Sequence, residues 1–248
     1  VRLAGVNSIN WARVLAQVVY YFSSAVALGA PRQKVSFTVP TGNFGDIFAG
    51  YIAKRMGLPI DRLIIAANHN NILHRAITTG RYDTNTVTPT ITPSMDIQVS
   101  SNFERALFEA YDRDGETVTK LMYELKKGGF GIDKKALLSL QNDFDSGWAT
   151  EESTRMTIKQ IYEGNSEILC PHSAVGVKVA NENLGHTPMI TLATAHPAKF
   201  PDAVKASMGK LPELPIGLAD LFDRPERLTD MPDDLALMKS LIRERIKL

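Results

Sequence analysis

The sequence has little cysteine, little net charge and no apolar run long enough for a membrane span, and each lack excludes a class of protein. Cys170 is the only cysteine in 248 residues, so no internal disulfide can form, and a reducing, cytoplasmic location is expected. The formal net charge is +1 and no run of five Lys or Arg occurs, which leaves no electrostatic basis for nucleic-acid binding. The most apolar stretch, residues 14–29, contains Gln17 and is shorter than the ~20 residues that cross a membrane. We therefore expect neither a nucleic-acid nor a membrane partner.

The order of expected elements predicts an α/β fold with an open, mostly parallel twisted sheet and helices on both faces. Ser8 is placed to cap a helix that runs from Ile9 to about Leu28. Strands are expected at residues 34–39, 61–68 and 188–194, and helices at residues 46–56, 102–112, 116–127, 134–142, 153–163, 171–185 and 232–248. Residues 83–96 hold five threonines and two prolines, and they are expected to form a long irregular loop of the kind that often carries function.

The first candidate site is the loop between the expected strand 34–39 and the following helix. It reads Gly42, Asn43, Phe44, Gly45 and Asp46. Two glycines permit close backbone approach, and N–H groups at a helix start suit an anion such as phosphate. The spacing fits neither the dinucleotide fingerprint nor the Walker A loop, and a plain turn with Asp46 as the helix cap explains the same residues. If the loop binds phosphate, Asp46 should point away, because a carboxylate would repel the anion.

Two further clusters carry polar groups at places where ligands gather. Asn7, Ser8 and Arg13 offer an amide, a hydroxyl and a guanidinium around an expected helix start, which suits an oxyanion. Thr194 ends an apolar strand, where its hydroxyl can meet a ring nitrogen. From these residues alone, an ordinary N-cap with a surface arginine, and a threonine that merely ends a strand, are the favoured explanations.

Cysteine and histidine give no clear catalytic or metal site. Cys170 would need a positioned base to act as a nucleophile, and His172 lies near it in sequence without having to touch it. His69, His74, His172 and His196 lack the spacing of metal ligands, and no metal is expected.

Three stretches in this order resemble threonine synthase of the bacterial and fungal type: "NSINWARVLAQVVYYF", "PTGNFGDIFAGYIAKRMGLP" and "TAHPAKF". The resemblance covers nearly the whole chain. It implies a tryptophan-synthase-β-like fold, the cofactor pyridoxal 5'-phosphate (PLP) and a carbon–oxygen lyase acting on a phosphate ester. The reaction that it implies converts O-phospho-L-homoserine and water to L-threonine and phosphate, the last step of threonine biosynthesis.

The resemblance also implies which residues bind each group. Backbone N–H groups of residues 42–46 would cradle the cofactor phosphate, and the hydroxyl of Thr194 would bond the pyridine nitrogen. Asn7, Ser8 and Arg13 would bind the phosphate of the substrate.

One part of the family pattern has no counterpart in this sequence. The lysine that carries the cofactor lies in a Phe-x-x-Lys-Asp-type motif in the family, and no such motif occurs here. Residues 1–248 are therefore expected to be the PLP-binding α/β region of the C-terminal portion, with an N-terminal portion of the same enzyme supplying the lysine. Two alternatives stay open, namely another PLP-dependent amino-acid dehydratase and a non-catalytic threonine-synthase-like binding protein.

Overall fold

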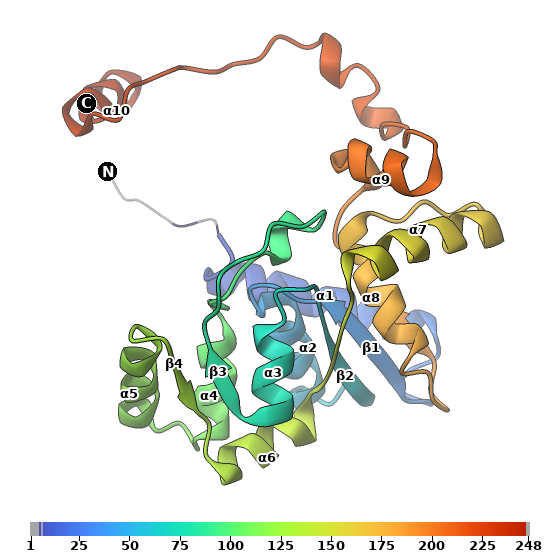
Figure 1. The fold of residues 1–248 in the computed structure, drawn as a ribbon, viewed down its shortest axis with the longest axis vertical. Helices are drawn as coiled ribbons and strands as arrows, with labels where there is room; N and C mark the ends of the chain where they lie inside the picture. Colours follow the sequence, from blue (N-terminus) through green and yellow to red (C-terminus); the bar gives the residue numbers. More distant parts are fainter. Residues whose placement is uncertain (1–4, 6, 247–248) are drawn as a thin grey trace. The chain divides into compact units, whose positions relative to one another are not determined.

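The computed structural model describes residue 5 and residues 7–246, which form parts of two compact units, Val1–Pro212 and Glu213–Leu248. Figure 1 labels their elements. The helices of the first unit are α1 (Trp11–Ala27), α2 (Gly45–Arg55), α3 (Ile72–Thr79), α4 (Phe103–Ala110), α5 (Gly115–Leu125), α6 (Lys134–Asp143), α7 (Glu151–Asn165), α8 (Pro171–Asn181) and α9 (Pro201–Met208), with the 3-10 turns η1 (Pro93–Met95) and η2 (Pro197–Lys199). Its strands are β1 (Val35–Pro40), β2 (Ile60–Ala67), β3 (Arg81–Asp83), β4 (Gly129–Gly131), β5 (Asp145–Trp148) and β6 (Met189–Thr191).

The second unit is small and carries only short turns and one terminal helix among its described residues. These elements are η3 (Ile216–Leu218), η4 (Leu221–Asp223) and α10 (Leu235–Ile246). No described residue of α10 is buried. The expected terminal helix is therefore present, and its last two residues lie outside the described part of the chain.

The centre of the first unit is a four-stranded sheet in the order β5-β2-β1-β6. All three strand pairs are parallel. The expected fold class, an open parallel sheet, is confirmed. Because the strands are parallel, their carboxyl ends meet along one edge, and this edge is where a ligand site is expected.

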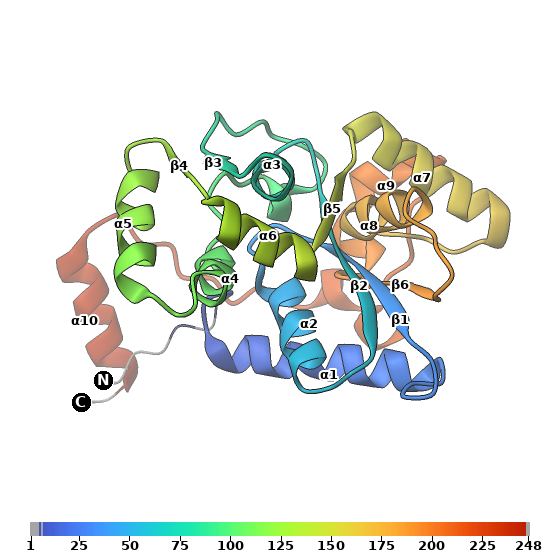
Figure 2. The same cartoon turned by 90° about the horizontal axis from the view of Figure 1, so that it is seen from below.

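Helices cover both faces of this sheet, with α1 and α2 on one side and α8 on the other (Figure 2). Phe37 of β1 packs toward α1, where its ring centroid lies 4.7 Å from that of Tyr21. Ile64 of β2 faces the opposite way and packs with Val175 and Val179 of α8. Since alternate side chains of β2 face different covered sides, the strand is continuously apolar from Leu63 to Ala67 instead of alternating.

Helix α1 begins two residues later than the sequence indicates, so the expected cap by Ser8 is wrong. The side chain of Asn10 caps the helix by accepting the backbone N–H of Ala12 at 2.9 Å. The carbonyl of Ser8 instead accepts a hydrogen bond from the side chain of Asn102 at 2.9 Å. None of the helices in the described residues could cross a membrane by its length and apolar content.

The edge strands of the sheet depart most from expectation. Strand β6 ends at Thr191, short of the expected end at Thr194. Strand β5 was not expected, because its four residues are only half-buried and show no apolar run. Gly147 allows β5 to lie under α8, since a Cβ there would come within 2.7 Å of Val179.

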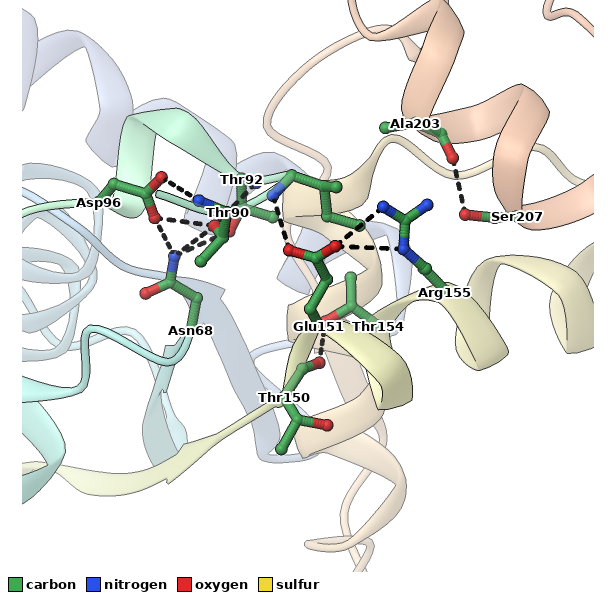
Figure 3. A network of polar contacts seen from close by, with 11 residues as sticks. Asn68, Thr90, Thr92, Asp96, Thr150, Glu151, Thr154, Arg155, Ala203 and Ser207 are labelled. Carbon is green, nitrogen blue, oxygen red and sulfur yellow. Dashed lines mark hydrogen bonds and ion pairs between the residues drawn. The ribbon is translucent and has the colours of Figure 1, made fainter. Parts of the chain in front are cut away.

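The irregular segment 83–96 is held in place by a polar network around Asp96 (Figure 3). One carboxylate oxygen of Asp96 accepts from the side chains of Asn68 at 2.7 Å and Thr90 at 2.8 Å. The other accepts the backbone N–H of Thr90 at 2.7 Å. Glu151 accepts the backbone N–H of Ile91 at 3.3 Å. The threonines therefore fix a loop that would otherwise lack backbone partners, and its end, η1, reaches the edge of the sheet.

Candidate functional site

A cavity of about 610 Å³ lies at the carboxyl end of β1. The loop after β1, helix α1, η1, α8 and the segment after β6 all contribute to its lining. The sequence-predicted site residues that line the cavity are Arg13, Gly42, Asn43, Phe44, Asp46 and Thr194. The structure thus brings residues from three distant stretches of sequence into one space.

The loop after β1 presents unpaired backbone N–H groups. Phe44 has a left-handed backbone, with φ of 65°, and it precedes the first residue of α2. The side chain of Asn43 accepts the N–H of Gly45 at 2.9 Å. The N–H groups of Gly42, Asn43 and Phe44 make no hydrogen bond with any other residue that the structure describes. Successive free N–H groups beside a left-handed residue form a concave site that suits an anion.

Close packing requires glycine at position 42. A Cβ there would lie 2.6 Å from the backbone carbonyl oxygen of Ser94, which belongs to η1. The carbonyl of Gly42 accepts the hydroxyl of Ser100 at 2.7 Å. A side chain at position 42 would therefore have to displace backbone, whereas at Gly45 the nearest atoms are the side-chain ends of Asn43 and Asn102.

The side chain of Phe44 anchors the loop in the core. Its ring centroid lies 5.2 Å from those of Phe103 and Phe144, in edge-to-face contacts. Only 1% of Phe44 is exposed. Burial of this ring offsets the strain of the left-handed backbone and fixes the loop at the lining of the cavity.

Asp46 does not cap α2, although a plain turn at this loop would use it as the cap. Phe44 occupies the cap position without any side-chain cap, and Asn43 supplies the oxygen that pairs with the first N–H. Asp46 lies in the first turn of α2 and lines the cavity. Its Oδ1 is buried and has no hydrogen-bond partner among the described residues. Burial raises the pKa of Asp46 to about 6, with the Tyr21 hydroxyl acting in the opposite direction.

Thr194 follows the end of β6 and is exposed to the cavity. Its backbone N–H donates to the hydroxyl of Ser173 on α8 at 3.2 Å. Ser173 also lies 3.2 Å from the sulfur of Cys170, which caps α8 by accepting the N–H of Ser173. Cys170 therefore has a structural explanation as a buried helix cap, and the contact with α8 positions Thr194.

The first predicted cluster divides into two parts. Arg13 lines the cavity, and its guanidinium makes no hydrogen bond with any residue that the structure describes. Asn7 and Ser8 precede α1 and do not line the cavity. The hydroxyl of Ser8 lies 3.3 Å from that of Ser101. Ser8 also connects indirectly to the glycine loop, because Asn102 donates to the carbonyls of both Ser8 and Asn43.

The sequence reasoning missed His172 and Lys199 as parts of this cavity. The Nε2 of His172 accepts the backbone N–H of Ser94 at 3.2 Å, and its Nδ1 is buried without a partner among the described residues. Burial and then the charge of Lys199 lower the pKa of His172 to about 4, so the ring is neutral at physiological pH. Lys199 adds a positive charge to the cavity. The sequence signal for Lys199 as a site residue is its position in the stretch "TAHPAKF". No sequence feature near His172 predicts its contact with Ser94.

A second cavity of about 570 Å³ lies between Trp11, α4 and α5. Its lining includes Phe48, Phe108, Met122 and Tyr123. None of the sequence-predicted site residues lines it. The polar cavity at the strand ends is therefore the candidate site.

The chain is similar to known proteins over almost its full length. Residues 173–242 match the family model described as threonine synthase, C-terminal. Threonine synthase of Pseudomonas aeruginosa is 50% identical over 97% of this chain and 52% of its own length. The solved structure of PLP-bound threonine synthase from Brucella melitensis is 55% identical with a TM-score of 0.95, and covers 98% of this chain and 53% of its own. The yeast threonine synthase structure is 42% identical with a TM-score of 0.89, and covers 98% of this chain and 53% of its own.

A more distant structure shares only the fold. A fungal L-serine ammonia-lyase from Rhizomucor miehei is 12% identical with a TM-score of 0.51, covering 80% of this chain and 58% of its own. The parallel sheet with its cavity at the strand ends is therefore the type II fold of pyridoxal-phosphate enzymes. Within that class, the chain matches threonine synthases along nearly its full length, and residues 173–242 match the C-terminal family model of threonine synthase. It spans about half the length of the curated relatives that it matches.

Proposed function

We propose that the chain is the PLP-binding portion of a threonine synthase, which converts O-phospho-L-homoserine and water to L-threonine and phosphate. The observation that carries this proposal is the loop of residues 42–46, in which the residues with free N–H groups line the same cavity as Thr194 and Arg13. The cytoplasm is the proposed location, since the single buried cysteine suits a reducing compartment. The rest of the same protein is the proposed source of the lysine that carries the cofactor.

The residues present fit PLP on chemical grounds. The loop offers donors to a phosphate, and the absence of a Cβ at Gly42 leaves the backbone close to η1. Thr194 offers a neutral hydroxyl to the pyridine nitrogen, which does not force that nitrogen to be protonated. When bound, PLP supplies an electron sink for the negative charge that remains after protons leave the substrate.

The chain's other polar groups suit a phosphorylated substrate. Arg13 has a planar fork of donors that can grip two oxygens of a phosphate. Because the leaving phosphate gains charge as its bond to carbon breaks, a fixed cation at this place stabilises the departure. Lys199 adds a second positive charge to the cavity, and neutral His172 adds no repulsion to it. Asn7 and Ser8 do not line the cavity, and we propose that they support this phosphate site from just before α1.

The test uses the complete protein that contains this chain, loaded with PLP. Released phosphate and L-threonine should appear in equal amounts from O-phospho-L-homoserine. Formation of 2-oxo acid from L-serine or L-threonine, without use of the phosphorylated substrate, would instead support the dehydratase. If borohydride traps no lysine bonded to PLP and no turnover occurs, the result would support a non-catalytic binding protein.

A further inference from the structure

The carboxyl group of Asp46 is the feature of the cavity that phosphate binding leaves unexplained. Asp46 is the last residue of the loop, lies in the first turn of α2, and is one of the residues that line the same cavity. Its Oδ1 is buried and has no partner among the residues that the structure describes. A buried oxygen of this kind normally finds a hydrogen-bond partner, and Asp46 is one of the residues that line the cavity in which a ligand would bind.

The groups around Asp46 do not supply a fixed counter-charge. From α1, the Tyr21 hydroxyl donates to the backbone carbonyl of Asp46 at 2.8 Å. Arg13 and Tyr20 also line the cavity from α1, but no ion pair joins Arg13 to Asp46 among the described residues. His172 and Lys199 contribute to the lining from α8 and η2.

The charged groups of α4 and β2 do not line this cavity. The α4 side chains Glu104 and Arg105 line the second cavity. Arg62, near the start of β2, forms an ion pair with Asp145 at 2.7 Å. Burial is the dominant influence on Asp46 and raises its pKa to about 6.

A phosphate monoester at this loop therefore meets a carboxyl group that cannot remain charged at low cost. A phosphate carries nearly two negative charges at neutral pH. Two like charges at hydrogen-bond distance disfavour the charged form of the weaker acid, as in a pair of carboxyls that share one proton. A shared proton removes the repulsion and gives Oδ1 or Oδ2 a partner.

We propose that a phosphate monoester binds at residues 42–46 together with one proton, which is held between the Asp46 carboxyl and a phosphate oxygen. Asp46 then acts as a neutral hydrogen-bond donor to the phosphate. This inference rests on the proposed function, in which the phosphate belongs to PLP. It predicts that phosphate affinity falls as pH rises, by up to about tenfold per pH unit where both groups are ionised in the free state.

Asp46→Asn separates this proposal from a purely structural explanation. Asparagine has nearly the same shape and is a permanent neutral donor, so the variant should bind phosphate without taking up a proton. Asp46→Ala removes the donor and should weaken binding at every pH. Asp61→Asn is the matched control, because Asp61 is an exposed carboxylate near the start of β2, at the opposite end of the sheet.

The experiment is calorimetric titration of the complete protein with pyridoxine 5'-phosphate, which lacks the aldehyde and cannot react with a lysine. Titrations in two buffers of different ionisation enthalpy, between about pH 7 and 9, give the number of protons taken up, since the free phosphate is already doubly charged there. Wild type and Asp61→Asn should take up close to one proton, and Asp46→Asn close to none, with a flat dependence of affinity on pH. Pyridoxine without phosphate should show no difference between wild type and Asp46→Asn.

The outcomes separate the inference from the proposed function. Equal proton uptake and equal pH dependence in wild type and Asp46→Asn would overturn the inference while leaving PLP binding intact. Absence of binding by every protein at every pH would overturn the proposed function and the inference with it. Proton uptake that depends on Asp46 could instead accompany binding of O-phospho-L-homoserine but not of pyridoxine 5'-phosphate. That result would overturn the assignment of the shared proton to the cofactor phosphate and assign it to the phosphate of the substrate.

Discussion

Asp46→Asn should stabilise the ligand-free protein at neutral pH but much less at acidic pH. Burial raises the pKa of Asp46 from its ordinary value of 3.8 to about 6. The folded protein therefore holds this proton at a higher pH than the unfolded chain does. Between these two pKa values the unfolded state binds fewer protons, so the free energy of unfolding falls as pH rises, and above about 6 the loss is complete.

The magnitude follows from the size of the shift. About two pKa units at about 1.4 kcal/mol each give an upper bound of about 3 kcal/mol at neutral pH. Roughly 2 kcal/mol of this loss of stability occurs between about pH 4.5 and pH 8. Partial solvent contact of the side chain reduces the effect, so 1–2 kcal/mol is the expected order of magnitude.

Urea unfolding of wild type and Asp46→Asn at about pH 4.5 and pH 8 measures this difference. The variant should gain stability relative to wild type as pH rises, while Asp61→Asn should show no such gain. A difference between Asp46→Asn and wild type that is the same at both pH values would refute the reasoning, because it would mean that Asp46 keeps an ordinary pKa in the folded protein.

The remaining predictions concern the complete protein and the two phosphates. Gly42→Ala should weaken PLP binding tenfold or more, since its Cβ would meet a backbone oxygen at 2.6 Å, and Gly45→Ala should weaken it less; equal losses in a PLP titration would contradict this. Thr194→Val should shift the visible spectrum of bound PLP and raise the activation free energy of turnover by about 1–3 kcal/mol. An unchanged spectrum would mean that another group bonds the ring nitrogen. Arg13→Lys should keep PLP bound but lower kcat/KM about ten- to a hundredfold in an assay of released phosphate; loss of PLP instead would assign Arg13 to the cofactor phosphate.

The central sheet could be predicted from sequence because its strands are buried on both faces. Residues 63–67 form an uninterrupted apolar run, and the structure places β2 between β1 and β5 with helices on both sides. The edge strand β5 could not be predicted in this way, because its four residues carry no periodic apolar signal. Its position depends on Gly147 fitting beneath Val179, which is a tertiary contact.

The candidate site was predictable only where local sequence determines local geometry. The glycine loop and Thr194 were found because each follows an apolar strand. The cap of α1 was assigned to the wrong residue, because Ser8 and Asn10 are both good caps and only the course of the preceding chain selects Asn10. Asp46 was misjudged for a related reason, since Asn43 already supplies the oxygen that a cap would provide. His172 enters the site through a bond to a residue 78 positions away, which no local pattern contains.

The most direct test of the central claim is a crystal structure of the complete protein with PLP bound. The account predicts the cofactor phosphate within hydrogen-bond distance of the N–H groups of Gly42, Asn43 and Phe44, and the pyridine nitrogen within hydrogen-bond distance of the Thr194 hydroxyl. A phosphate bound elsewhere, with these N–H groups facing solvent or another segment of the protein, would contradict it.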